Sequence, residues 1–194
     1  MILFFLFLLN GSLFLLHSDA ACPEIVTRAA WGARPPKSRQ IMRTPVEHVF
    51  IHHTDGAICN NKDTCSKVMR QTQNFHMDTR KWADIGYSFL VGGDGRIYEG
   101  RGWNGVGAHT YNYNSKSIGI SFVGNFEKNT PNRAMLTAAR QLIDCGIEKN
   151  IITRGRQIHG HRDAKCTSCP GTALYKNIQA WPGFKGGKLP GYVC

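Results

Sequence analysis

The sequence predicts a single α/β domain in which buried strands alternate with amphipathic helices around one core. Two apolar runs, 46–53 and 117–124, are continuous, which is typical of strands inside a sheet that is covered on both faces. Apolar side chains recur at helical spacing in two other segments, 65–79 and 130–149. The 194 residues suffice for one domain with a substantial core, and no internal repeat indicates a second domain.

The first twenty residues predict a secretory signal peptide, 1–20. An apolar run over 1–16 precedes Ser18-Asp19-Ala20, a small-x-small cleavage site, although no Lys or Arg comes before the run. The alternative is a membrane anchor, but Asn10-Gly11-Ser12 interrupts the run, which is hardly long enough to span about 30 Å. We therefore expect a secreted, soluble mature protein, 21–194, without a transmembrane segment.

The N-terminal half contains shorter signals. The segment 22–43 is expected to be irregular and extended, because Pro35-Pro36 excludes a helix there. Strands are predicted at 87–91 and 96–99. Between them, the glycines of 92–95 can adopt the positive φ of a hairpin turn.

The C-terminal half contains two predicted helices, one short predicted strand and a tail. Thr130-Pro131 is expected to begin the helix over 130–149, with threonine as N-cap and proline in the first turn. A short strand is predicted at 158–161 and a last helix at 173–181. The remaining residues, 183–194, form a tail rich in glycine and lysine.

The chain is strongly basic, with 24 Lys and Arg against 13 Asp and Glu and a formal net charge of +11. Such a charge attracts polyanions of any kind. The basic residues are dispersed and no nucleic-acid-binding motif accompanies them, so nucleic acid is not an expected partner. For a secreted protein, an anionic cell surface is the expected one.

Seven cysteines in a secreted protein leave one unpaired. That residue is a free thiol, an intermolecular link or a metal ligand. Cys59 and Cys65 enclose a short polar loop and form the pair that is easiest to accept.

The segment 160–171 carries the strongest chemical signal. It offers His161 and, eight positions later, Cys169, and imidazole and thiolate are the commonest zinc ligands. A third ligand is available in His52-His53, of which only one can face a given metal because side chains alternate along a strand. His159 shares a face with His161 and is a rival ligand. Three protein ligands with an open fourth position indicate catalytic zinc. A surface histidine beside a disulfide cysteine explains the spacing equally well.

A glycine-rich loop, 100–110, contains no phosphate-binding or dinucleotide-binding fingerprint. Its Trp103, Asn104 and His109 suit a groove wall that stacks on a polar ligand and hydrogen-bonds to it. An ordinary connecting loop is the alternative.

From about Cys22 to Trp181-Pro182, the chain resembles the peptidoglycan recognition proteins and, more distantly, the zinc amidases that include certain bacteriophage lysozymes. Several motifs in the same order carry this resemblance: Trp31-Gly32-Ala33-Arg34-Pro35-Pro36, Ile51-His52-His53-Thr54, Asp84-Ile85-Gly86-Tyr87-Ser88-Phe89, Tyr98-Glu99-Gly100-Arg101-Gly102-Trp103, Gly107-Ala108-His109, Ser117-Ile118-Gly119-Ile120 and Gly160-His161-Arg162.

The resemblance implies a mixed, mostly parallel β-sheet flanked by helices, with a groove over one face. It implies that His52, His161 and Cys169 hold Zn²⁺, and that Tyr87 and Thr167 are catalytic. The implied reaction is hydrolysis of the amide between the lactyl group of N-acetylmuramic acid and L-alanine by a zinc-bound water.

The resemblance also assigns substrate contacts and disulfides. His53, His109 and the run Trp103-Asn104-Gly105 fall at positions expected to contact muropeptide. Its cysteine pairs imply Cys22–Cys145 and Cys59–Cys65. From the two cysteines that remain we infer a third bond, Cys166–Cys194, which ties the tail beside the segment 160–171.

Two rival functions follow from the same residues. One is a non-catalytic receptor that binds peptidoglycan without turnover. The other is a cationic antimicrobial protein whose killing survives loss of zinc and collapses in salt. In each case we expect a monomer.

Overall fold

The structure of the protein is a computed structural model that describes residues 22–194. The predicted signal peptide, 1–20, lies outside the described residues. Within 22–194, none of the helices combines the length and apolar character that crossing a bilayer requires.

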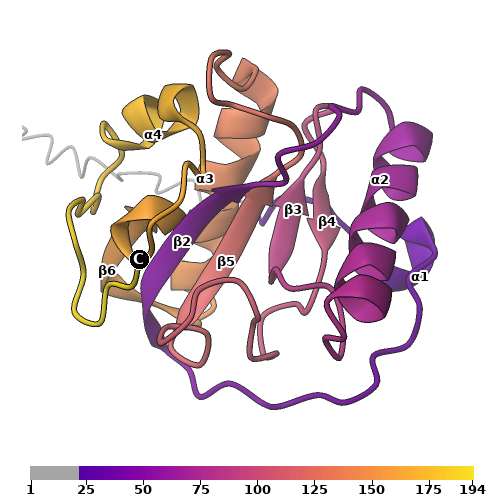
Figure 1. The fold of residues 1–194 in the computed structure, drawn as a ribbon, viewed down its shortest axis with the longest axis horizontal. Coiled ribbons are helices and arrows are strands. Elements are labelled where there is room, and N and C mark those ends of the chain that lie inside the picture. Colours follow the sequence, from indigo (N-terminus) through magenta and orange to yellow (C-terminus); the bar gives the residue numbers. More distant parts are fainter. Residues whose placement is uncertain (1–21) are drawn as a thin grey trace, which may run out of the picture.

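A six-stranded sheet forms the centre of the domain, in the order β1-β4-β3-β5-β2-β6 (Figure 1). Only β3 and β4 pair antiparallel, and every other neighbouring pair is parallel. The predicted mixed, mostly parallel sheet is therefore confirmed. The strands are β1 (Ile25–Val26), β2 (Val46–His53), β3 (Phe89–Val91), β4 (Ile97–Glu99), β5 (Ser117–Phe122) and β6 (Ile152–Gly160).

Helices cover the two faces of the sheet unequally. On one face, α3 (Arg133–Glu148) packs behind β2 and β5, and α4 (Thr172–Ile178) lies beside β6 (Figure 1). On the other face, α1 (Arg28–Trp31) and α2 (Lys62–Asn74) pack against β3 and β4. The second face of β2 and β5 is left to loops, and the site is built there.

Strand alternation sorts the side chains of β2 and β5 between these faces. The side toward α3 is aliphatic and fully buried, and comprises Val49, Ile51, Ile118 and Ile120. The opposite side carries Phe50 and His52 on β2, which pair in register with Gly119 and Ser121 on β5. Both β5 residues are small, and the ring of His109 occupies the space over Gly119.

The helix predicted over 65–79 differs at both ends. It begins at Lys62 because the side chain of Asn61 accepts a hydrogen bond from the backbone N–H of Thr64, while the Thr64 side chain returns the interaction. It ends at Asn74 and continues as a π-helical turn, Phe75–Thr79. The wider turn sets the direction in which the following residues leave the helix.

Two other predictions of local structure were wrong. The N-cap of α3 is Asn132, whose side chain accepts from the N–H of Met135, and Thr130 therefore lies two residues before the cap. The N-terminal segment is not wholly irregular, since it contains β1 and α1. A Thr27 cap begins α1 and Gly32, at φ 76°, ends it before the prolines.

Three disulfides close the domain. They join Cys22 to Cys145, Cys59 to Cys65 and Cys166 to Cys194, as the resemblance and our inference led us to expect. Among the described cysteines, Cys169 is the free one and it is buried.

Candidate metal centre and groove

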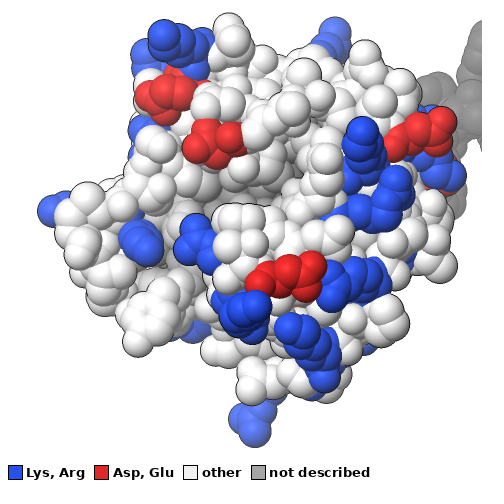
Figure 2. All heavy atoms as spheres, turned by 45° about the vertical axis from the view of Figure 1, so that its right-hand side comes forward, with Lys and Arg blue, Asp and Glu red and all other residues white. Residues whose placement is uncertain are grey.

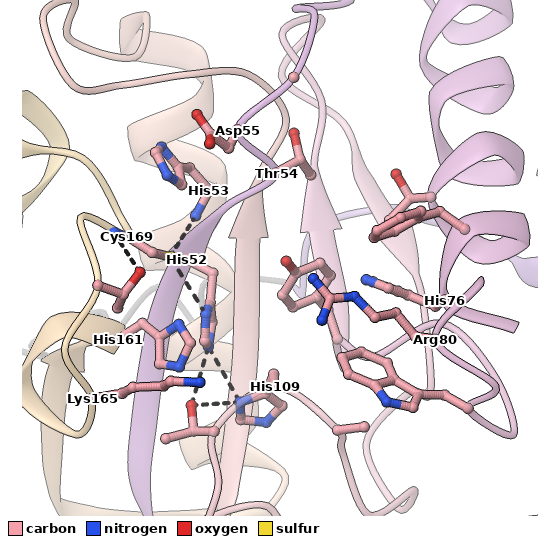
Figure 3. A pocket seen from close by; sticks show the side chains of 18 of the residues that line it. His52, His53, Thr54, Asp55, His76, Arg80, His109, His161, Lys165 and Cys169 are labelled. Carbon is pink, nitrogen blue, oxygen red and sulfur yellow. Dashed lines mark hydrogen bonds between the residues drawn. The ribbon is translucent and has the colours of Figure 1, made fainter. Parts of the chain in front are cut away.

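A pocket of about 800 Å³ opens over the loop-covered face of β2 and β5. Its walls come from four parts of the chain: the end of β2 with the loop after it, the inner side of α2, the loop around His109, and the segment 161–169 (Figure 3). In Figure 2, the surface is hollowed near the centre of the view, and both basic and acidic side chains lie around the hollow.

Three donor groups meet on one side of this pocket. The ligand atoms of His52, His161 and Cys169 all lie within 4.8 Å of one another. Topology brings them together, because β2 and β6 are parallel neighbours and His52 and His161 stand where those strands end at the same edge. The Cys169 sulfur lies 3.7 Å from Nδ1 of His52 and accepts the His53 N–H at 3.5 Å.

The two rival histidines stay outside this group. His53 points to the other side of β2, where its Nδ1 accepts the backbone N–H of Phe126 at 3.3 Å. His159 lies 3.1 Å from His48 and 2.6 Å from the carbonyl oxygen of Lys185. His159 and His161 lie on the same side of the sheet, as expected, because the His159 ring packs against Phe50 and the His161 ring against His52, with centroids 5.0 Å and 4.6 Å apart. His159 is therefore one step further along β2 from the donor group.

The donor set fits a zinc ion. Burial holds the pKa of His52 well below its usual value and lowers that of His161 to about 4, so both imidazoles are neutral at neutral pH and keep a lone pair. Burial also raises the pKa of the Cys169 thiol to about 12. A bound divalent cation is what stabilises a buried thiolate, and two imidazoles with one thiolate are ligands that zinc prefers.

Tyr87 and Thr167 both line the pocket. The Tyr87 ring centroid lies 5.3 Å from that of His52, and burial raises the pKa of its hydroxyl, which therefore keeps its proton and can donate a hydrogen bond. The Thr167 hydroxyl lies in the segment 161–169, where it accepts the Cys169 N–H at 3.2 Å.

His109 and Thr110 contact the Nε2 side of the His52 ring. Nδ1 of His109 lies 3.2 Å from Nε2 of His52, and the Thr110 hydroxyl lies 3.0 Å from His109 Nδ1 and 3.4 Å from His52 Nε2. The carboxamide oxygen of Asn114 accepts the backbone N–H groups of both loop residues at 2.8 Å. Burial lowers the pKa of His109 to about 3. Sequence reasoning missed Thr110 and Asn114, whose only signal is that they follow a histidine in a glycine-rich loop.

The inner side of α2 forms the opposite wall. Val68, Thr72 and Phe75 recur at helical spacing and line the pocket. The core-facing residues of α2 are Cys65, Met69 and Gln73. After the π-helical turn, Arg80 reaches into the pocket beside His76 (Figure 3). His76 is packed in the fold, since its Nδ1 accepts the Gly86 N–H at 3.0 Å and its ring centroid lies 4.7 Å from that of Trp82.

The run Trp103-Asn104-Gly105 is not brought to this pocket. The Trp103 ring packs on Phe89 with centroids 4.5 Å apart, and the carbonyl oxygen of Asn104 accepts the Met42 N–H. Gly105 borders a separate pocket of about 50 Å³. His53 and His109 line the main pocket, and contact with substrate stays a prediction for all five residues.

Comparison with known proteins gives a consistent result. Residues 42–172 match the family described as N-acetylmuramoyl-L-alanine amidase. Peptidoglycan-recognition protein SC2 of Drosophila simulans is 45% identical over 161 residues, which cover 83% of this chain and 88% of that protein. Peptidoglycan recognition protein 1 of Bos indicus is 43% identical over 165 residues, which cover 84% of this chain and 87% of that protein.

Solved structures agree with the sequence relatives. The structure of bumblebee PGRP-SA superposes with a TM-score of 0.84 at 43% identity, and the match covers 86% of this chain and 99% of that one. Human PGRP-IBETAC, solved in complex with glycosamyl muramyl pentapeptide, gives 0.82 at 45% identity, covering 84% and 99%.

Proposed function

The chain belongs to the N-acetylmuramoyl-L-alanine amidase family and, within it, to the peptidoglycan recognition proteins, and from this membership we propose that it is a secreted, zinc-dependent amidase. Its substrate is bacterial peptidoglycan or a muropeptide, and the bond cleaved joins N-acetylmuramic acid to L-alanine. One observation carries the proposal: His52, His161 and Cys169 present their donor atoms within 4.8 Å at the wall of an open pocket.

These three residues would hold the ion, and all three line the pocket. When bound, zinc supplies Lewis-acid chemistry, since it lowers the pKa of a coordinated water toward about 7 and polarises a carbonyl. With Nδ1 of His52 toward the sulfur, its Nε2 carries the hydrogen and donates it to His109 or Thr110. Such an outer contact fixes the tautomer and the ring orientation of a metal-binding histidine.

Tyr87 and Thr167 act on the scissile amide. The Tyr87 hydroxyl is protonated and stands beside His52, so it can donate a hydrogen bond to the oxygen that gains negative charge during attack. The Thr167 hydroxyl accepts the Cys169 N–H and can donate its own hydrogen in a second bond to that oxygen. Both residues therefore stabilise charge, and neither is suited to act as a base at neutral pH.

Three further features support secretion and an anionic polymer as partner. Three disulfides are stable in an oxidising compartment. The net charge of +11 favours approach to an anionic bacterial surface. The solved relative with a muramyl pentapeptide supports a muropeptide as the ligand of the pocket.

The test is incubation of the purified protein with a defined muropeptide, with and without a chelator, followed by detection of released stem peptide. The amidase predicts release that stops with chelator, returns with zinc and is lost in Cys169→Ser. His48→Gln, which alters a histidine outside the donor group, should cleave as the wild type does. Retention of muropeptide without release in zinc would refute the amidase and leave the non-catalytic receptor.

A further inference from the structure

The C-terminal segment 183–194, here called the strap, runs along the free edge of the sheet and ends beside the metal loop, 161–169 (Figure 1). It starts next to β6, where Ile158 forms a parallel bridge with Phe184 and its carbonyl oxygen accepts the N–H of Lys185 at 2.8 Å. It finishes in the Cys166–Cys194 disulfide. The strap therefore joins the last strand of the sheet to the loop that carries two of the three donor residues.

The metal loop begins with a 3-10 turn, His161–Asp163, and is irregular after it. Within it, the Arg162 N–H donates to the carbonyl oxygen of Cys169 at 2.9 Å and the Lys165 N–H to that of His161 at 3.2 Å. Cys166 and Ser168 are exposed to solvent. Because this middle part of the loop is exposed and belongs to no regular helix or strand, its position depends on the contacts that other segments make with it.

The strap holds the loop through its backbone. The N–H of Cys166 donates to the carbonyl oxygen of Val193 at 2.8 Å, and the Val193 N–H donates to that of Ala164 at 3.3 Å. Further back, the Leu189 N–H donates to the carbonyl oxygen of Asp163 at 2.8 Å. These bonds and the disulfide act on the stretch between His161 and Cys169.

The Asp163 carboxylate adds a buried connection at the start of the same stretch. One oxygen accepts the Tyr175 hydroxyl at 2.6 Å and the Gly187 N–H at 3.1 Å, and the other accepts the Gly160 N–H at 2.8 Å. The end of β6, α4 and the strap are thus tied to one side chain. Its position two residues after His161 makes the orientation of that imidazole dependent on the same contacts.

The strap also contacts the loop that follows His109 and Thr110. The Tyr113 hydroxyl donates to the carbonyl oxygen of Pro190 at 3.1 Å, and the Asn112 side chain donates to that of Gly191 at 3.4 Å. Leu189 packs against the buried cluster that contains Tyr113 and Phe50. The strap therefore spans from the metal loop to the loop that carries Thr110.

We propose that the strap is a positioning element of the metal centre. It holds the loop 161–169 against β2, so that the donor atoms of His161 and Cys169 are within reach of His52 before the cation arrives. Donors that are ordered in advance lose less conformational freedom when the ion binds, and the affinity is higher for that reason. The identity of the ion rests on the proposed function, whereas the ordering of the loop does not.

The test removes the disulfide in a double variant, Cys166→Ser with Cys194→Ser, because a single change would leave a free thiol near Cys169. We expect zinc affinity, measured by competition with a chromogenic chelator, to fall about 10- to 100-fold, the range typical when support around a ligand is lost. Hydrogen exchange of the amides in 161–169 should become faster in the zinc-free protein. The control is Cys59→Ser with Cys65→Ser, which removes a disulfide from the cluster of Trp31 and Met69 and should leave zinc affinity unchanged.

A milder variant, Tyr113→Phe, removes one strap contact and keeps the ring, so it reports on the strap even when the double variant does not fold. Its zinc affinity should fall several-fold. Wild-type zinc affinity and unchanged loop exchange in a folded strap variant would overturn the proposal, as would equal losses in both disulfide variants. If the wild type bound no zinc, the proposed function would fail, and hydrogen exchange in 161–169 would still decide the role of the strap.

Discussion

Gly119 gives a direct test of the support beneath His52. A Cβ added at this position would lie 2.4 Å from Cδ2 of His109, 2.5 Å from its Cγ and 2.6 Å from its Nε2. Ordinary carbon contacts begin near 3.4 Å, so the ring in Gly119→Ala must move by about 1 Å. The backbone at Gly107 is equally close to the ring, because a Cβ added there would lie 2.4 Å from the same Cδ2.

This displacement should affect both stability and metal binding. Overpacking of a well-packed core costs about 1–3 kcal/mol. The contact of 3.2 Å between His109 Nδ1 and His52 Nε2 would lengthen beyond hydrogen-bonding distance after a shift of that size. Loss of an outer partner lowers metal affinity by about 10- to 100-fold. The second effect corresponds to about 1.4–2.8 kcal/mol of binding free energy.

Urea unfolding measures the first effect and a zinc competition titration the second. The control is Gly155→Ala, since a Cβ at Gly155 meets no atom within 4 Å. That exposed strand position should change the unfolding free energy by no more than about 0.5 kcal/mol. A Gly119→Ala protein with the zinc affinity and stability of the Gly155→Ala protein would refute the reasoning.

Three other predictions concern single side chains. Burial lowers the pKa of His76 from 6.5 to about 4, so the unfolded chain takes up the proton first as the pH falls. The contribution of neutral His76 to the free energy of unfolding is fully present above pH 6.5 and declines by up to about 3 kcal/mol toward pH 4. His76→Asn, which keeps an acceptor for Gly86, should reduce that slope in urea unfolding at a series of pH values, and an unchanged slope would contradict the assignment. Thr110→Val should lower zinc affinity about tenfold in a competition titration while Thr110→Ser retains it, and equal affinities in both would exclude a role for the hydroxyl. Tyr87→Phe should reduce kcat on muropeptide about 10²- to 10³-fold with zinc affinity unchanged, and a variant that turns over normally would remove Tyr87 from the chemistry.

The donor set was accessible from the sequence for a chemical reason. Cysteine and histidine are few, an odd cysteine count leaves one thiol without a disulfide, and Cys169 follows His161 at a short distance. The choice between His161 and His159 was not accessible from the residues alone. It depends on the register of β6 against β2, which sets His159 beside Phe50 and His161 beside His52, and register is a tertiary feature that a local sequence pattern does not contain.

Local capping errors have a similar cause. Thr130 and Asn132 are both good N-cap residues on either side of Pro131, and the sequence favoured the first because proline is common at the first helical position. In the structure, Asn132 takes the role by accepting the Met135 N–H and also donates to the carbonyl oxygen of Gly93. The second contact comes from the hairpin between β3 and β4, which lies far away in the chain.

The wall formed by α2 shows the limit of periodicity more clearly. Helical spacing identifies Val68, Thr72 and Phe75 as one side of a helix, and a hydrophobic side is normally read as the core side. Here the core takes the adjacent side through Cys65 and Met69, and the stripe lines the pocket. Apolar side chains suit both positions, because one side of a helix can bury apolar surface against the core and another can present it to a ligand. Whether such a helix side lines a pocket or packs in the core depends on the residues opposite it. Around His52 those residues come from loops, whose sequences have no regular spacing of apolar side chains.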